Sequence, residues 1–204
     1  MNKERARQII TGTALAWLFV LALSLSAYKV RNVDIPWHLA AGKWMLEHKQ
    51  VPRLDPFRFG EPPLEWLDAQ WLYQLINYGA YLALGESALT LLTMAMSAIV
   101  LGLLLLAAPR SLPRGLFALV GLVFLAAINP RLMNRPELLT CVYMGAMLLA
   151  LERARAGRTR ALVCLPLIEI LWANSQGLWP IGIALVGAYW GDEAWRRRGE
   201  AAFS

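Results

Sequence analysis

Long apolar stretches separated by short polar ones form the dominant pattern of the chain. These stretches read as apolar helices and lie at 9–28, 87–108, 116–128, 138–151, 161–172 and 178–190. A helix needs about 20 mostly apolar residues to cross the hydrocarbon of a bilayer, so the shorter stretches are expected to extend into their polar flanks. The pattern predicts an all-α polytopic bundle of about six transmembrane helices in a single membrane domain, 1–204. Its first span is expected at 9–29 and its remaining spans within 86–191.

The segment between the first two spans, 30–85, is expected to form a long extracytoplasmic loop. Apolar residues recur at helical spacing over 36–48, and Pro36 suits the first turn of a helix. Over 66–84, polar and aromatic residues alternate, a mixture typical of a helix that lies in the headgroup region of a membrane. The loop is therefore predicted to hold two amphipathic juxtamembrane helices, 36–48 and 66–84.

Basic residues cluster beside the apolar stretches, where they indicate the cytoplasmic side of a membrane. The clusters lie at 3–7, 110–114, 153–160 and 196–198. All of them fall on one side, with a cytoplasmic N-terminus, if 67–84 lies along the membrane. If 67–84 crosses instead, the cluster at 110–114 lies outside against the rule, and the pattern leaves both alternatives open. The first apolar stretch is longer than the roughly 7–15 residues of a cleaved signal, which favours an uncleaved anchor.

The composition agrees with a membrane protein. Hydrophobic residues make up 58% of the chain and charged residues 17%, against about 45–50% and roughly 25% in soluble domains. The net charge of +6 comes from the clusters beside the spans. The sequence has no basic face with interleaved aromatic residues, so it does not indicate a nucleic-acid partner. Cys141 and Cys164 fall near opposite ends of adjacent predicted spans, so no disulfide is expected.

Residues suited to chemistry gather in the outward loops. Asp34 follows the first span closely, and its carboxylate can act as a general base or merely cap the helix that begins at Pro36. Arg131 and Arg135 lie in an outward turn, where they can bind phosphate or simply extend charged ends to water. The other candidates in these loops are His38, Asp55, Glu61, Glu137, Asn174 and Gln176.

Glu169 stands apart because it lies inside an apolar stretch. An ionisable group within a span is a functional candidate, and the alternative is a carboxylate that reaches the interface or a neighbouring arginine. For metal binding, Asp34 and His38 are too few ligands, and no HxxxH or CxxC pattern occurs. A histidine on a short interfacial helix is more often structural than a ligand. A divalent metal therefore has no support from a ligand motif, and no cofactor is indicated.

The loop sequence itself carries a resemblance. DIPWHLAAGKWMLEH and EPPLEWLDAQWLYQLINYGAYLALGES, within 34–90, place an acidic residue after the first span, then a helix, a Pro-Pro-Leu turn, an aromatic helix and a glycine. This order resembles the first extracytoplasmic loop of GT-C superfamily glycosyltransferases, which include the protein O-mannosyltransferases and the lipid A aminoarabinose transferases. NPRLMNRPELLT and LWANSQGLWPIG, at 129–140 and 171–182, look like motifs of uncharacterised bacterial members.

The resemblance implies a transferase that acts on the outer face of a bacterial inner membrane. Its donor would be a polyprenyl-phosphate sugar held among membrane lipid, with Asp34 as catalytic base and Arg131 and Arg135 on the donor phosphate. No second acid adjoins Asp34, Gln176 stands where the family pattern has histidine, and fewer spans are predicted than such enzymes usually have. The chain is therefore expected to be the N-terminal conserved module of such an enzyme, or to be completed by further helices or a partner subunit. The alternative is a non-catalytic membrane subunit or lipid-binding scaffold with the same fold.

Overall fold

The computed structural model of the chain describes residues 3–27, 32–60, 62, 64–109, 111–128 and 133–202. Its helices are α1 (Lys3–Ser26), α2 (Ile35–His48), α3 (Trp71–Leu84), α4 (Glu86–Ala107), α5 (Arg114–Ile128), α6 (Pro136–Arg155), the 3₁₀ helix η2 (Thr159–Val163), α7 (Cys164–Ala173) and α8 (Pro180–Ala202). A lone antiparallel bridge joins Leu54 to Glu65, and the described residues form no strand. The predicted all-α fold is confirmed for this part of the chain.

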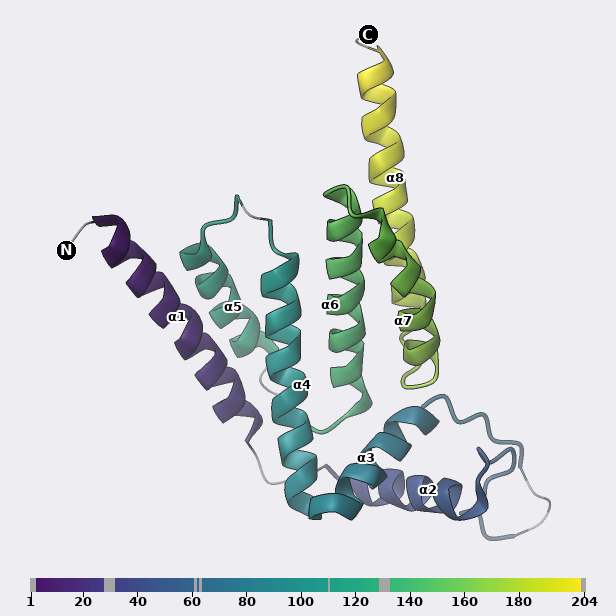
Figure 1. The fold of residues 1–204 in the computed structure, drawn as a ribbon. Helices are drawn as coiled ribbons and strands as arrows, with labels where there is room; N and C mark the ends of the chain where they lie inside the picture. The colour runs from purple at the N-terminus through teal and green to yellow at the C-terminus, as the bar shows by residue number, and fades with distance from the viewer. Residues whose placement is uncertain are drawn as a thin grey trace.

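The helices fall into an upright group and a pair that lies across one end of it. Figure 1 shows α1, α4, α5, α6, α7 and α8 standing upright, with α2 and α3 across their lower ends. Within the upright group, α4 contacts α1 and α6, and α6 contacts α7 and α8, while α3 joins α2 to α4. The start of α1, the α4–α5 and α6–α7 connections and the end of α8 all lie at the end opposite to α2 and α3 (Figure 1).

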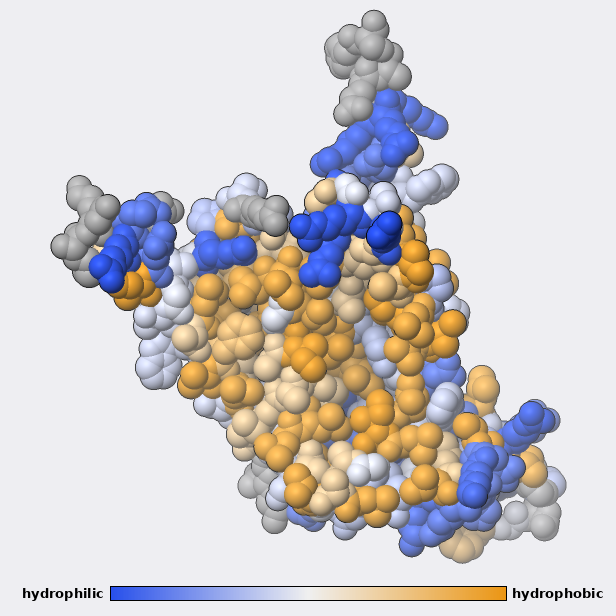
Figure 2. Space-filling model, in the orientation of Figure 1, coloured by the Kyte–Doolittle hydropathy of each residue, from blue (hydrophilic) through white to orange (hydrophobic). Residues whose placement is uncertain are grey.

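Two of the described helices are long and apolar enough to cross a membrane. They are Glu4–Ser26, which forms nearly all of α1, and Glu86–Ala107, which is α4. The other predicted spans also form helices, but α5 has 15 residues and α7 has 10, fewer than the roughly 20 that hydrocarbon requires. Hydrophobic side chains cover the middle of the upright group, and hydrophilic residues gather toward its two ends (Figure 2).

A turn makes α3 shorter than the predicted helix 66–84. The side chain of Asp68 accepts a hydrogen bond from the backbone N–H of Gln70 at 2.9 Å, a local pairing that competes with helix formation. The helix therefore begins at Trp71. At its other end Gly85 adopts a φ of +63°, which glycine tolerates without strain, and α4 follows at once.

Glycine also lets α2 and α3 pack closely. A Cβ atom added to Gly42 on α2 would lie 2.5 Å from the backbone oxygen of Gln74 and 2.6 Å from the Cβ atom of Tyr78, both on α3. Real Cβ atoms do not approach other atoms this closely, so the two helices can keep this spacing only with glycine at position 42. The pair is thereby held as one layer beneath the upright helices.

The core of the upright group lies among α1, α4, α5 and α6. It contains Leu18, Met96, Leu101 and Leu125, all buried. The buried hydroxyls of Ser26 on α1 and Ser97 on α4 are hydrogen-bonded at 2.7 Å, a polar link of the kind that fixes the register of apolar helices.

Candidate functional site

A cavity of about 430 Å³ lies where α2, the segment before α3 and the start of α6 meet. Its wall includes Asp34, Trp37 and His38, the segment 66–70, and the segment 135–137. These parts are far apart in the chain, and all of them come from the predicted outward loops. The fold therefore brings Asp34, His38, Arg135 and Glu137, predicted separately, to one place.

Asn134 holds the walls of the cavity together. Its backbone oxygen accepts a hydrogen bond from the Asn32 side chain at 3.1 Å, although the two residues are 102 positions apart. Its side-chain oxygen accepts from the Tyr73 hydroxyl at 2.5 Å, and its side-chain nitrogen donates to the backbone oxygen of Leu89 at 3.1 Å. All four residues are buried. Asn134, which directly precedes Arg135, is thus hydrogen-bonded to the first loop, α3 and α4.

The start of α6 forms the positive part of the wall. Arg135 is the N-cap residue of α6, with an extended backbone and no side-chain cap bond. Its half-buried side chain has a buried Nε atom without a hydrogen-bond partner among the described residues. The partial positive charge of the helix N-terminus adds to that of the guanidinium. This corner of the cavity is therefore suited to an anion such as phosphate.

Asp34 occupies the N-cap position of α2, but its side chain makes no cap hydrogen bond. Its backbone N–H donates instead to the Asn32 side chain at 3.1 Å, which orders the turn. The residue is exposed at the cavity. The Asp34 carboxylate therefore does not cap α2, which was one of its two expected roles.

His38 and Asp68 form the buried side of the cavity, with exposed fractions of 3% and 6%. Burial lowers the pKa of His38 to about 4, against the opposing effect of Asp34 and Glu137, so its imidazole is neutral at pH 7. Burial also raises the pKa of Asp68, although bonds from Gln70 and Gln74 oppose the shift. The Nδ1 atom of His38 and the Oδ2 atom of Asp68 are buried without a hydrogen-bond partner in the described residues.

Several predicted site residues lie away from this cavity and have structural contacts. The side chain of Asp55 accepts the backbone N–H of Phe57 at 2.9 Å, which closes a turn in the first loop. Asn174 accepts a hydrogen bond from the indole N–H of Trp71 at 2.8 Å and so attaches the α7–α8 connection to α3. The amide oxygen of Gln176 accepts from Thr140 at 3.2 Å.

The remaining predictions fall elsewhere. Glu169 lines a separate apolar cavity of about 400 Å³ among α6, α7 and α8, and both its carboxylate oxygens are buried without a partner in the described part of the chain. It therefore does not pair with an arginine there. Glu61 and Arg131 lie outside the described residues. Among those that are described, no three His, Cys, Asp or Glu side chains form a group that could hold a metal ion.

Two residues of the site were not singled out from the sequence. Asp68 was one of the polar residues expected in the outward loops but was not proposed as a site residue, and Asn134 was not a candidate at all. The position of Asp68 two residues before Gln70, with a helix after them, is a turn signal that could have identified it. Comparisons with family models, curated proteins and solved structures found no match to this chain. The functional argument consequently depends on the cavity itself.

Proposed function

We propose that the chain is a membrane glycosyltransferase, or the conserved module of one, that transfers a sugar from a polyprenyl-phosphate donor to an acceptor on the extracytoplasmic face. One observation carries the proposal: four buried polar atoms without partners belong to residues of the same cavity. They are His38 Nδ1, Asp68 Oδ2, Arg135 Nε and Glu137 Oε2. Buried polar groups are nearly always hydrogen-bonded, so this concentration favours a polar ligand that supplies their partners.

The placement of the helices supports a site at a membrane surface. In this proposal about six upright helices cross a bacterial inner membrane, and α2 and α3 lie along its outer face. The basic clusters then share the cytoplasmic side, because the start of α1, the α4–α5 and α6–α7 connections and the end of α8 lie together (Figure 1). The cavity lies at the opposite end, as the positive-inside rule requires for an extracytoplasmic site.

Arg135 is the proposed donor-phosphate ligand. Its guanidinium and the N-terminus of α6 lie in one corner of the cavity, and both favour the negative charge of a phosphodiester. Arg131 remains a second proposed ligand in the same loop. Glu137 follows in the first turn of α6, where its carboxylate can accept a hydrogen bond from a donor or acceptor hydroxyl.

Asp34 is the proposed catalytic base. The acceptor hydroxyl oxygen would form a bond to the anomeric carbon as the bond from that carbon to the phosphate oxygen breaks. The polyprenyl phosphate would leave with the electron pair of that bond, and the acceptor proton would pass to the Asp34 carboxylate. The exposed carboxylate with no cap bond supports this role, which typically contributes about 10²–10⁴-fold in rate.

The proposal is tested by binding and transfer measurements on the protein in nanodiscs. A short-chain polyprenyl phosphate should bind the parental protein, and Arg135→Gln should weaken its binding about tenfold or more, as loss of a charge-assisted contact would. The matched control is Arg58→Gln, because Arg58 is exposed and hydrogen-bonds within the loop, to Pro62. Equal binding by the parental protein and Arg135→Gln would refute the phosphate site.

Transfer separates an enzyme from a scaffold. With a polyprenyl-phosphate sugar as donor, Asp34→Asn should bind the donor as the parental protein does but lose transfer. Parental-rate transfer by Asp34→Asn would show that another group is the base. Binding without transfer by the parental protein, supplied with donor and candidate acceptors, would favour the non-catalytic lipid-binding subunit.

A further inference from the structure

We propose that the buried side of the cavity is a sugar subsite, in which Asp68 and His38 hydrogen-bond the ring hydroxyls and the paired indoles of Trp37 and Trp66 pack against the ring. The inference rests on the proposed function and deepens it, because it assigns the part of the donor that lies beyond the phosphate. None of these four residues is needed for phosphate binding at Arg135.

The two oxygens of Asp68 have different environments. Its Oδ1 atom accepts hydrogen bonds from the backbone N–H of Gln70 at 2.9 Å and from the side chain of Gln74 at 3.2 Å. Its Oδ2 atom is buried and has no partner among the described residues. The side chain is thus held in place by one oxygen and leaves the other for a ligand, an arrangement that fixes the geometry of recognition before binding.

His38 extends this polar surface. Its ring stands edge-on to Tyr73, with the ring centroids 5.0 Å apart, and packs beside Trp37 at 4.8 Å. The imidazole is therefore fixed in orientation, while its Nδ1 atom has no partner in the described part of the chain. A neutral imidazole nitrogen donates or accepts according to its tautomer. A hydroxyl group also does both, so it can match either form of His38 and the acceptor on Asp68.

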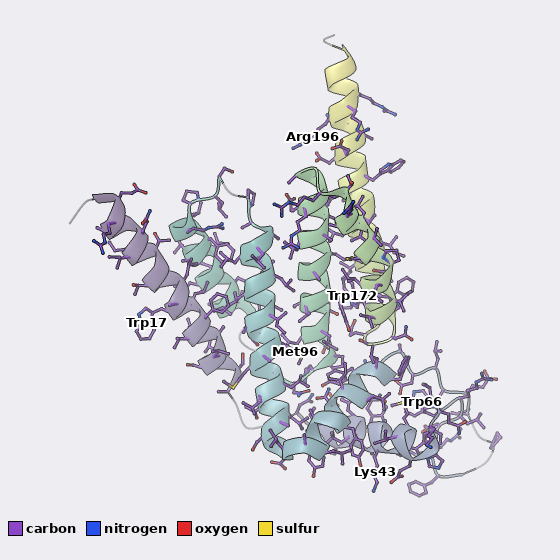
Figure 3. All side chains as sticks on the ribbon, in the orientation of Figure 1. Trp17, Lys43, Trp66, Met96, Trp172 and Arg196 are labelled. Carbon is purple, nitrogen blue, oxygen red and sulfur yellow. The ribbon has the colours of Figure 1, made fainter. Side chains whose placement is uncertain are left out.

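Aromatic rings complete the subsite. The indoles of Trp37 and Trp66 lie 5.6 Å apart at an interplanar angle of 43°, and both line the cavity. Trp66, labelled in Figure 3, lies in the loop before α3, two residues before Asp68. A sugar ring presents C–H groups on its faces and hydroxyls around its edge. Apolar rings next to a few fixed polar atoms form the kind of surface that such a ligand requires.

The distribution of charge sets the orientation of the bound donor in the cavity. Arg135 and the α6 N-terminus offer the donors that phosphate needs, whereas Asp68 offers an acceptor, which would repel phosphate. The phosphate is therefore assigned to the Arg135 corner and the sugar to the Asp68 side of the same cavity. Among the described residues of this side, no three His, Cys, Asp or Glu side chains form a group that could hold a metal ion.

The test compares three soluble phosphates, of which one carries a sugar, one carries a ring without hydroxyls and one carries no ring. Calorimetry on the full chain in nanodiscs would measure binding of glucose 1-phosphate, cyclohexyl phosphate and inorganic phosphate. Glucose 1-phosphate should bind at least about tenfold more tightly than cyclohexyl phosphate, since hydrogen bonds to a charged group are strong and a polar site rejects an analogue that lacks the hydroxyls. This comparison needs no variant, so it holds even if a substitution impairs folding.

Asp68→Asn then tests the assignment. Asparagine keeps an oxygen for Gln70 and Gln74 but replaces the free acceptor with an N–H donor. It should remove the preference for glucose 1-phosphate and leave cyclohexyl phosphate binding unchanged within about twofold. Asp55→Asn is the matched control, because Asp55 closes a turn outside the cavity and should retain the preference.

Each outcome bears on a different statement. Equal binding of the two organic phosphates to the parental protein would overturn the sugar subsite and leave the phosphate site standing. A preference that persists in Asp68→Asn would show that the hydroxyls bind elsewhere and would overturn the assignment. If none of the three probes binds, the proposed function fails together with the subsite.

Discussion

The Asn134 side chain should contribute several times more to the free energy of unfolding than its small size indicates. It is 4% exposed and joins α3 and α4 through two hydrogen bonds, from the Tyr73 hydroxyl and to the Leu89 backbone oxygen. Asn134→Leu keeps the branched shape of the side chain and the backbone contact to Asn32 but removes both side-chain bonds. The buried Tyr73 hydroxyl would then have lost its acceptor.

The expected cost follows from what each partner loses. Tyr73 is fully buried, and burial raises the pKa of its hydroxyl, so the group stays protonated and loses the acceptor that Asn134 provides. A buried donor that loses its acceptor costs about 1–3 kcal/mol. Leu89 loses less, because its backbone oxygen also accepts from the Thr93 hydroxyl at 2.9 Å. Asn134→Leu should therefore lower the free energy of unfolding by about 2–3 kcal/mol.

A double-mutant cycle separates this mechanism from a general packing defect. Unfolding in detergent would be followed by circular dichroism for the parental protein, Asn134→Leu, Tyr73→Phe and the double variant. Tyr73→Phe should destabilise the parental protein but cost nothing further in Asn134→Leu, where it removes the orphaned hydroxyl. The coupling should reach about 1–3 kcal/mol. Additive effects, within about 0.3–0.5 kcal/mol, would refute the reasoning.

The other predictions concern α2. Gly42→Val should destabilise the α2–α3 layer by more than about 2 kcal/mol, because its Cβ would meet the backbone of α3. The control is Gly79→Ala, where no atom lies near the added Cβ. Equal melting temperatures of the two variants would contradict the close packing. The pKa of His38 is lowered to about 4, so the native state binds fewer protons than the unfolded chain between about pH 6.5 and 4. Stability from His38 is complete above that range and lost as the pH falls through it. His38→Gln should flatten this part of the stability–pH curve. Equal slopes for the parental protein and His38→Gln would show that His38 does not titrate in this way.

The helices were predictable because their signals are local. Apolar stretches mark every upright helix, and the predicted 36–48 agrees with α2 to within one residue at its start. The start of α3 was missed by several residues because a side-chain bond from Asp68 competes with the helix there. The lengths of α5 and α7 also differ from spans of full length, since composition indicates where a helix is apolar more clearly than where it ends.

Some residues of the cavity were predictable from the sequence, but their grouping was not. Asp34 and Arg135 were identified by residue type and by the side of the membrane, but Asn174 and Gln176 share both properties and serve as loop anchors instead. The cavity residues and the loop anchors differ in which turns meet across α3, and this depends on long-range packing. Asn134 is the clearest case, because its three partners lie on elements that no local pattern connects.

The Asn134 connection also has a consequence for the order of assembly during synthesis. The first loop, α3 and the start of α4 leave the ribosome long before Asn134, and until it arrives the Tyr73 hydroxyl and the Asn32 side chain lack these partners. Contacts between distant parts of a chain form late because their loops are costly to close. The cavity can therefore be completed only after α4 and α5 have been synthesised and α6 has begun. An immature chain would carry the acidic half of the site without its arginine.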